Sequence, residues 1–320
     1  MDSILSQLSL CGVIPVIKID DASQAVSLAR ALFAGGITTA EVTFRTDAAA
    51  YAIRSIASEC PNVLVGAGTV LDTAQCRLAI EAGARFIVTP GYVSDVVNFC
   101  REAGVPIIPG CASAADMSHA VSAGIEVVKF FPSETLGGLR ALKAYAPVFP
   151  KLRFIPTGGV KADNFLDYLS YERVCACGGS WIVPSDLLAA GHFEEITALC
   201  RKTVLSMLDF RLAHVGINAE NSTEAERIAH CFDTLLSLPT TATPISYFAG
   251  TAVEVMSGSG RGTMGHIGFY TRSIPRARAY FERMGVRFCE SSARFDEKGN
   301  IKLIYFDDEI SGFAVHLTQA

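Results

Sequence analysis

Apolar runs alternate with amphipathic stretches along the first two thirds of the chain. Short runs rich in Val, Ile, Phe and Thr predict buried strands, and each is followed by a segment with apolar residues at helical spacing. The predicted strands are residues 13–19, 39–44, 63–70, 86–90, 106–110, 127–131, 154–159 and 174–181, and the predicted helices are residues 25–33, 48–57, 72–82, 94–103, 114–123, 139–144, 162–169 and 193–207. Eight strand–helix pairs in roughly 200 residues indicate an α/β fold. They favour a closed (β/α)8 TIM barrel over an open sheet.

The pattern changes after Met207. A strand at 214–218, a helix at 225–236, a turn-rich linker at 239–244 and a strand at 251–256 form a first set, and a Gly/Ser-rich stretch, 257–262, follows it. The second set has a strand at 266–271, a helix at 274–284 and strands at 286–295, 301–306 and 313–318. Both sets open with His-x-Gly and close with an alternating strand, so they form a degenerate repeat. We therefore expect a barrel domain, residues 1–208, and a smaller α+β domain, residues 209–320.

Net charge, apolar runs and cysteine spacing limit the binding partners and the cellular compartment that we expect for this protein. The 320 residues carry a formal net charge of -5 without basic clusters, so nucleic acid is not an expected partner. No apolar run reaches the ~18 residues that would span a membrane, and none ahead of Pro15 is typical of a secretory signal. The ten cysteines include no Cys-x-x-Cys pair, which favours reduced thiols in a cytoplasmic protein.

Lys129 stands inside the apolar run from Ile125 to Pro132, with two aromatic residues after it. One interpretation is that its side chain reaches out to solvent. The other is chemical, because a desolvated ammonium loses its proton readily and a neutral amine can form an imine with a carbonyl. The surroundings of Lys129 decide between the two.

In parallel barrels the chemistry collects at the carboxyl ends of the strands. Polar and special residues do fall at the predicted ends, namely Lys18, Glu41, Arg45, Thr69, Thr89-Pro90 and Lys129. Glu41 could be the structural ion partner of a buried amine or a proton-transfer group. Arg45, just beyond its strand, could clamp a carboxylate or lie on the surface.

Glycine pairs follow the last two predicted strands. Gly158-Gly159 and Gly178-Gly179-Ser180 would place bare backbone amides beside helix starts, where a phosphate can be held. Each pair alone could be an ordinary turn. Their coincidence on strands seven and eight predicts a phosphate site, because barrels commonly bind phosphate there.

Six short blocks together resemble the 2-keto-3-deoxy-6-phosphogluconate aldolase family, which includes 4-hydroxy-2-oxoglutarate aldolases. They are EVTFRT (41–46), VGAGTV (65–70), VTPG (88–91), VKFFP (128–132), PTGGV (156–160) and GGSW (178–181). The resemblance covers about residues 5–205. It implies a class I aldolase that cleaves 2-keto-3-deoxy-6-phosphogluconate, of the Entner-Doudoroff route, or 4-hydroxy-2-oxoglutarate. The products would be pyruvate and an aldehyde, glyceraldehyde 3-phosphate or glyoxylate. It also implies a homotrimer and an aldolase reaction without a cofactor.

The resemblance assigns expected roles. Lys129 is the Schiff-base lysine and Glu41 the general acid/base. Arg45 grips the substrate carboxylate, while Thr69 and Pro90 line the pocket. The remaining positions are the basic residue Lys18 and, around the distal phosphate, Phe131, Gly158, Gly159, Gly179 and Ser180. One block departs from the family pattern: residues 109–116 have Ala114 in place of the second proline of the block, so we expect a looser loop there. Ser113 keeps a hydroxyl and Asp116 keeps a carboxylate at the positions where the family has Thr and Glu.

The last third, about residues 212–320, resembles the vicinal oxygen chelate (glyoxalase-like) fold of paired βαβββ modules, with the first module short by a strand or two. By that resemblance His214, Glu254, His266 and His316 would hold a divalent metal. Histidine with glutamate suits Zn²⁺, Mn²⁺ or Fe²⁺. The alternative is a metal-free module for packing or ligand sensing.

Two other functions stay open on the residues alone. The barrel could be a phosphate-binding isomerase or decarboxylase that forms no imine, with Lys129 as an electrostatic group. It could also be inactive and carry a C-terminal module that binds a small molecule. The set of Glu41, Arg45 and Lys129 favours the aldolase.

Overall fold

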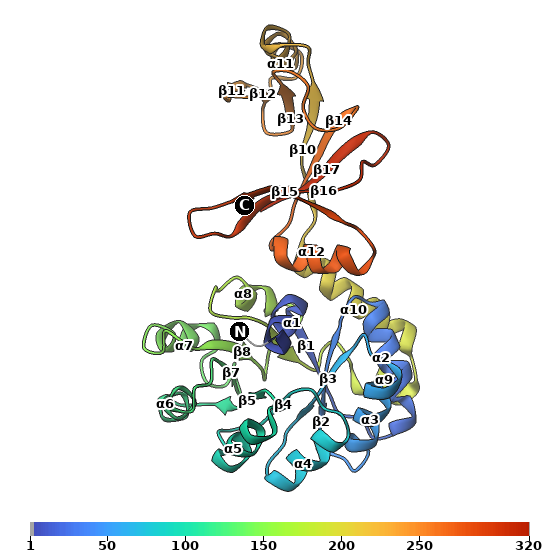
Figure 1. The fold of residues 1–320 in the computed structure, drawn as a ribbon, viewed down its shortest axis with the longest axis vertical. Helices are drawn as coiled ribbons and strands as arrows, with labels where there is room; N and C mark the ends of the chain where they lie inside the picture. The colour runs from blue at the N-terminus through green and yellow to red at the C-terminus, as the bar shows by residue number, and fades with distance from the viewer. Residues whose placement is uncertain (1–2, 320) are drawn as a thin grey trace. The chain divides into compact units, whose positions relative to one another are not determined.

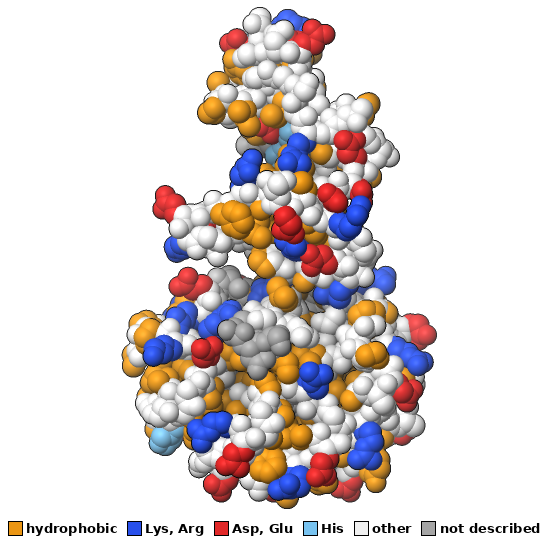
Figure 2. All heavy atoms as spheres, viewed as in Figure 1, with side chains coloured by type: hydrophobic (Ala, Val, Ile, Leu, Met, Phe, Trp, Pro, Cys, Tyr) orange, Lys and Arg blue, Asp and Glu red, His pale blue; other side chains and the backbone are white. Residues whose placement is uncertain are grey.

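The computed structural model describes residues 3–319, which divide into two compact units between residues 207 and 208. Figure 1 shows helices around a parallel sheet in the first unit and a largely antiparallel sheet with two helices in the second. Within residues 3–319, none of the helices combines the length and apolar character needed to cross a bilayer. Acidic and basic side chains are interspersed over the face drawn in Figure 2.

The strands of the first unit form a closed ring. Pairing runs β5-β4-β3-β2-β1-β9 and β6-β7-β8, while parallel bridges from Phe154 to Val174 and from Thr157 to Gly178 join β8 to β9. The segments β5 and β6 are one predicted strand interrupted at Pro109. The strands are β1 (Val13–Ile17), β2 (Thr39–Thr43), β3 (Leu64–Gly68), β4 (Ile87–Val88), β5 (Ile107–Ile108), β6 (Gly110–Cys111), β7 (Val127–Phe130), β8 (Arg153–Pro156) and β9 (Cys177–Gly179). This is the arrangement of a parallel α/β barrel.

Helices alternate with these strands as predicted. They are α2 (Ala25–Ala34), α3 (Ala49–Glu59), α4 (Thr73–Glu81), α5 (Ser94–Ala103), α6 (Ala114–Ser122), α7 (Gly138–Tyr145), α8 (Phe165–Leu169) and α10 (Phe193–Leu208). The prediction omitted α1 (Ser3–Cys11), the 3-10 turn η1 (Ala22–Gln24) and α9 (Ser185–Ala190). It also began α8 too early, because the Asn164 side chain accepts a hydrogen bond from the Lys161 amide and holds 161–164 as a turn.

Helix α1 covers one end of the barrel. Its residues Ile4 and Leu8 pack with Ile14, Phe86 and Val127, which lie at or near the starts of strands. Burying a side chain such as Leu8 contributes about 1.5–3 kcal/mol, so this contact closes the amino ends of the strands firmly. The carboxyl ends, which carry the predicted chemistry, stay on the other end of the barrel.

The ten cysteines are free thiols, and all except Cys231 and Cys289 are buried. The Sγ atoms of Cys76 and Cys100 lie 3.4 Å apart. Buried thiols of this kind pack as small apolar residues.

The second unit is a single sheet with internal symmetry. Its order, β11-β12-β13-β10-β14-β17-β16-β15, places the two opening strands side by side at the centre. The first half contains β10 (Arg211–Asn218), α11 (Ser222–Leu236), β11 (Thr240–Ala242), β12 (Ser246–Ala249) and β13 (Val253–Met256). The second contains β14 (Gly265–Tyr270), α12 (Ile274–Arg283), β15 (Phe288–Phe295), β16 (Ile301–Phe306) and β17 (Phe313–Thr318).

The expectation of a shortened first half was wrong. Strand β11 lies in the stretch predicted as a linker, and it pairs with β12 through Thr240–Ala249 and Thr241–Phe248. The polar Thr-rich sequence and the flanking prolines concealed a short edge strand, where such residues are tolerated. Both halves therefore have the order strand, helix, three strands.

Candidate active site and candidate metal centre

Lys129 and Glu41 form a buried ion pair inside the barrel. Lys129 Nζ lies 3.1 Å from Glu41 Oε1, with the two side chains 6% and 4% exposed. Lys129 comes from β7 and Glu41 from β2, so the closed ring brings them together. Burying a lone charge costs several kcal/mol, so a lysine at this position needs its carboxylate partner. The interpretation in which Lys129 reaches solvent is wrong.

The strand beside β2 leaves room for this carboxylate. A Cβ at Gly68, the last residue of β3, would lie 2.1 Å from Glu41 Oε1. Lys129 Nζ also lies 5.3 Å from the centre of the Phe131 ring. The absent side chain and the aromatic face together fix where the amine and the carboxylate meet.

Three predicted substrate residues follow strands β2, β3 and β4, at the same end of the barrel as Lys129. Arg45 is exposed, and its Nε donates to Thr43 Oγ1 over 3.1 Å. Thr69 takes a left-handed backbone conformation with φ 55°, which is uncommon for a residue with a branched Cβ. Pro90 is partly buried directly after β4.

Lys18 does not join this group. It is exposed, and its Nζ lies 2.8 Å from both carboxylate oxygens of Asp20. An exposed pair of this kind contributes about 0–1 kcal/mol. The structure therefore places Lys18 in a surface ion pair.

The loop that departs from the family pattern is tied to its helix. Ser113 Oγ accepts from the Asp116 amide, and Asp116 Oδ2 accepts from the amides of Ser113 and Ala112 at 3.0 Å each. This capping box satisfies amides that otherwise lack partners at the start of α6. The structure therefore gives no support to the expected loosening.

The glycine loop after β8 offers free amides. Gly158 and Gly159 have φ values of 88° and 81°, which glycine adopts without strain. Within residues 3–319, the amides of Gly158, Gly159 and Ser180 donate to no protein acceptor. Helices begin only at Phe165 and Ser185, so the loop amides, rather than helix ends, are the available anion donors.

Sequence reasoning missed three residues beside this loop. Ser133 and Glu134 follow β7, and Tyr168 lies on α8. The Tyr168 hydroxyl lies 2.9 Å from Ser133 Oγ and also donates to Glu134 Oε1. Nothing in the sequence pairs Tyr168 with residues 133 and 134, because helix periodicity explains its burial equally well.

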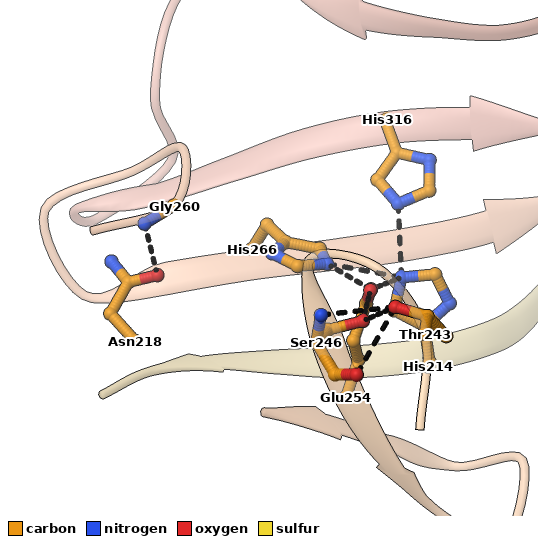
Figure 3. Close-up of polar contacts among 8 residues, drawn as sticks. All are labelled: His214, Asn218, Thr243, Ser246, Glu254, Gly260, His266 and His316. Atoms are coloured by element: carbon orange, nitrogen blue, oxygen red, sulfur yellow. Dashed lines mark hydrogen bonds and ion pairs between the residues drawn. The ribbon is translucent and has the colours of Figure 1, made fainter. Parts of the chain in front are cut away.

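Three histidines and a glutamate converge in the second unit (Figure 3). His214 Nε2 lies 3.1 Å from His266 Nε2 and 3.2 Å from His316 Nε2. Glu254 Oε2 lies 3.1 Å from His266 Nε2 and 3.4 Å from His214 Nε2. The structure thus brings together all four residues that were predicted to bind a metal.

The two His-x-Gly segments explain this convergence. In the antiparallel pair of β10 and β14, Gly216 lies opposite His266, and His214 lies opposite Gly268. A Cβ at Gly216 would lie 1.9 Å from His266 Cε1, and one at Gly268 would lie 2.9 Å from His214 Cε1. Each glycine therefore leaves the space that the other segment's histidine fills.

Burial favours the neutral form of His214 and His316. Desolvation lowers the pKa of His214, and it lowers that of His316 to about 3 with help from the neighbouring histidines. Burial alone would raise the pKa of Glu254, but hydrogen bonds from His266 and Ser246 outweigh it and lower that pKa. Neutral imidazole and ionised carboxylate are the forms that bind a metal.

The cluster has the dimensions of a tetrahedral site. With bonds of about 2.0–2.1 Å, two ligand atoms of a tetrahedral zinc ion lie about 3.3–3.4 Å apart, close to the four distances given above. Ser246 Oγ donates to Glu254 Oε1 over 2.6 Å and orients the carboxylate. A cavity of about 400 Å³, lined by Thr241, Phe248, Tyr270 and Thr318, opens beside His214.

A buried amine beside a carboxylate, at the end of a parallel barrel where free loop amides also lie, defines a class of enzyme. These are lyases that bind a carbonyl substrate as an imine. The same residues also fall in the region matched by known proteins.

Residues 4–199 match the family model described as "Aldolase: KDPG and KHG aldolase". The 2-dehydro-3-deoxy-phosphogluconate aldolase of Treponema pallidum is 50% identical over 204 residues, 64% of this chain and 97% of the relative. The KHG/KDPG aldolase of Escherichia coli K12 is 44% identical over 199 residues, which are 62% of this chain and 93% of the relative.

A solved structure agrees. The KDPG aldolase of Legionella pneumophila, with pyruvate captured as a covalent carbinolamine, gives a TM-score of 0.61 at 38% identity, covering 63% of this chain and 98% of that one. The chain belongs to the KDPG and KHG aldolase family. Its barrel is a class I, Schiff-base aldolase, and the family match ends before the second unit begins.

Proposed function

We propose that the barrel cleaves 2-keto-3-deoxy-6-phosphogluconate, and also 4-hydroxy-2-oxoglutarate, to pyruvate and an aldehyde. The aldehydes are glyceraldehyde 3-phosphate and glyoxylate, respectively. The observation that carries this is the 3.1 Å contact between Lys129 and Glu41, whose side chains are only 6% and 4% exposed. Names of close relatives support the substrates, since they are KDPG and KHG aldolases.

Lys129 supplies the nucleophile. Its neutral amine attacks the C2 ketone, and loss of water gives a protonated imine that accepts the electron pair of the C3–C4 bond. Glu41 removes the proton of the C4 hydroxyl, through a water where the distance requires it, and the bond breaks to give the aldehyde and an enamine. Protonation at C3 and hydrolysis then release pyruvate and restore the amine.

The remaining residues position the substrate. Arg45 pairs with the C1 carboxylate, and Thr69 and Pro90 line the pocket beside it. Phe131 borders the amine, while Gly158, Gly159, Gly179 and Ser180 surround the distal phosphate, to which the amides of Gly158, Gly159 and Ser180 donate. Binding the two ends of the substrate holds the reacting carbon at Lys129.

Reductive trapping tests the imine. Incubation with pyruvate and borohydride is expected to leave one covalent adduct per chain, mapped by peptide mass spectrometry to Lys129. A barrel that isomerises or decarboxylates without an imine would give no adduct, and so would an inactive barrel. An adduct on a different lysine would also contradict the assignment.

We further propose a homotrimer in the cytoplasm. Buried free thiols support a reducing compartment. Light scattering coupled to size-exclusion chromatography is expected to give three times the mass of the 34.1 kDa chain. A monomer or dimer would contradict the trimer.

For the second unit we propose a glyoxalase-like module that holds one divalent metal. His214, Glu254, His266 and His316 would bind it, and the ion would act as a Lewis acid on an oxygen of a ligand in the neighbouring cavity. The two halves, each with the order strand, helix, three strands, support the fold. Elemental analysis of dialysed protein is expected to find one transition-metal ion per chain.

A further inference from the structure

The segment after β7 and the glycine loop after β8 are joined beyond the ends of their strands. The Ser133 amide donates to the Thr157 carbonyl over 2.7 Å, and the Glu134 amide donates to the Gly158 carbonyl over 3.0 Å. A Cβ at Gly159 would lie 2.5 Å from Glu134 Cγ, so the Glu134 side chain lies directly against the loop. The loop with the free amides therefore has a carboxylate next to it.

That carboxylate poses an electrostatic problem. A phosphate on the amides of Gly158 and Gly159 would lie near a second negative charge, and like charges repel more strongly where water is partly excluded. The Tyr168 hydroxyl donates to Glu134 Oε1, which fixes the carboxylate at α8 instead of leaving it free beside Gly159. Burial, together with this hydrogen bond, raises the pKa of Tyr168, so the hydroxyl keeps its proton.

Tyr168 also holds the segment itself. Its hydroxyl lies 2.9 Å from Ser133 Oγ, and both residues are buried. Helix α8 follows the glycine loop in the chain. The Tyr168 hydroxyl therefore links the segment after β7, the strand of Lys129, to the helix that follows the glycine loop. In the described residues, the Tyr168 hydroxyl, Ser133 Oγ and the Glu134 carboxylate form no hydrogen bond with the Lys129–Glu41 pair.

We propose that Tyr168 is a positioning residue that fixes the glycine loop and restrains the Glu134 carboxylate, so that the barrel accepts substrates with a distal phosphate. This inference rests on the proposed phosphate-binding role of the loop. It predicts an effect on one substrate only, because 4-hydroxy-2-oxoglutarate carries no phosphate. It leaves imine formation at Lys129 untouched.

The test compares two substrates in the full-length protein. Tyr168→Phe is expected to raise KM for 2-keto-3-deoxy-6-phosphogluconate by about tenfold, as expected for loss of a hydrogen bond to a charged group. Its kcat, its KM for 4-hydroxy-2-oxoglutarate and its borohydride adduct with pyruvate are expected to stay within about twofold of the unaltered protein. Tyr171→Phe, a tyrosine just beyond α8 without contact to Ser133 or Glu134, is the matched control and should change neither KM.

A double substitution separates charge from packing. Adding Glu134→Gln to Tyr168→Phe removes the carboxylate that Tyr168 restrains, so most of the lost affinity for the phosphorylated substrate should return. An equal rise of KM for both substrates, or no change for either, would overturn the inference. If Glu134→Gln does not reverse the rise of KM for the phosphorylated substrate, the Glu134 carboxylate is not the cause of that rise.

A second variant covers the case in which Tyr168→Phe does not fold. Glu134→Gln alone keeps an acceptor for the Tyr168 hydroxyl and removes the charge, so KM for the phosphorylated substrate should fall about two- to fivefold without change for the other. An unchanged ratio of the two KM values would contradict the inference. The proposed function fails separately, if the unaltered protein gives no pyruvate adduct or cleaves neither substrate.

Discussion

Lys129 Nζ lies 3.1 Å from Glu41 Oε1, although 88 positions separate the two residues in the chain. The pair is more than nine-tenths buried, in a barrel whose strands β2 and β7 do not pair with each other. A charged group so placed is stable only with its partner, and in its neutral form the amine is a nucleophile held beside a base. Catalysis and the stability of the site therefore depend on the same contact.

Replacing the nucleophile tests the first half of the pair. Lys129→Ala and Lys129→Arg are both expected to lower kcat by at least about 1,000-fold, because a guanidinium stays protonated and cannot form an imine. Steady-state cleavage and borohydride trapping measure the loss. Lys151→Arg, at an exposed position, is the control and should keep full activity. An adduct in either Lys129 variant would refute the assignment.

Neutralising the base should separate imine formation from bond cleavage. Glu41→Gln is expected to keep the pyruvate adduct while cleavage slows by about 10²–10⁴-fold, the range usual for loss of a general base. Rapid-quench kinetics with each substrate measures both steps. Unimpaired cleavage would show that Glu41 is only the structural partner of Lys129.

Filling the space beside Glu41 should have the same consequence without removing its carboxylate. In Gly68→Ala the new Cβ would lie 2.1 Å from Glu41 Oε1, so the carboxylate must leave the position in which it contacts Lys129. Cleavage should fall at least tenfold, and stability by about 1–3 kcal/mol, as for an overpacked core. Gly258→Ala, where a Cβ meets nothing within 4 Å, should change neither. Wild-type cleavage by Gly68→Ala would mean that the position of Glu41 is not critical.

Removing one ligand should empty the metal centre of the second unit. His316→Ala is expected to lose the ion and the stability that binding adds, about 2.7 kcal/mol at 100 times the Kd. Elemental analysis and thermal unfolding with and without a chelator measure both. His230→Ala, on the exposed face of α11, is the matched control. Equal metal content in the two variants would show that His316 is not a ligand, and absence of metal from both would show that the histidines pack without an ion.

Much of the fold of both units follows from sequence, because local patterns encode local structure. Helix 94–103 was predicted with the bounds of α5, and strands 301–306 and 313–318 with those of β16 and β17. Lys129, Glu41 and the glycine pairs were recognisable because polar groups at the ends of apolar strands are unusual. Helices α1 and α9 were not predicted from the sequence, because short helices are stabilised chiefly by the tertiary surface that they cover.

The amino-acid sequence by itself determined the alternation of strands and helices, the residues available for imine chemistry and the four metal-binding candidates. Only the tertiary structure decided that Lys129 meets Glu41, that Lys18 pairs with Asp20 on the surface and that Tyr168 holds Glu134 beside the glycine loop. It also decided that His266 fills the space left by Gly216. The physical reason is that periodicity reports which face of an element is buried, whereas ring closure and strand register decide which buried groups touch.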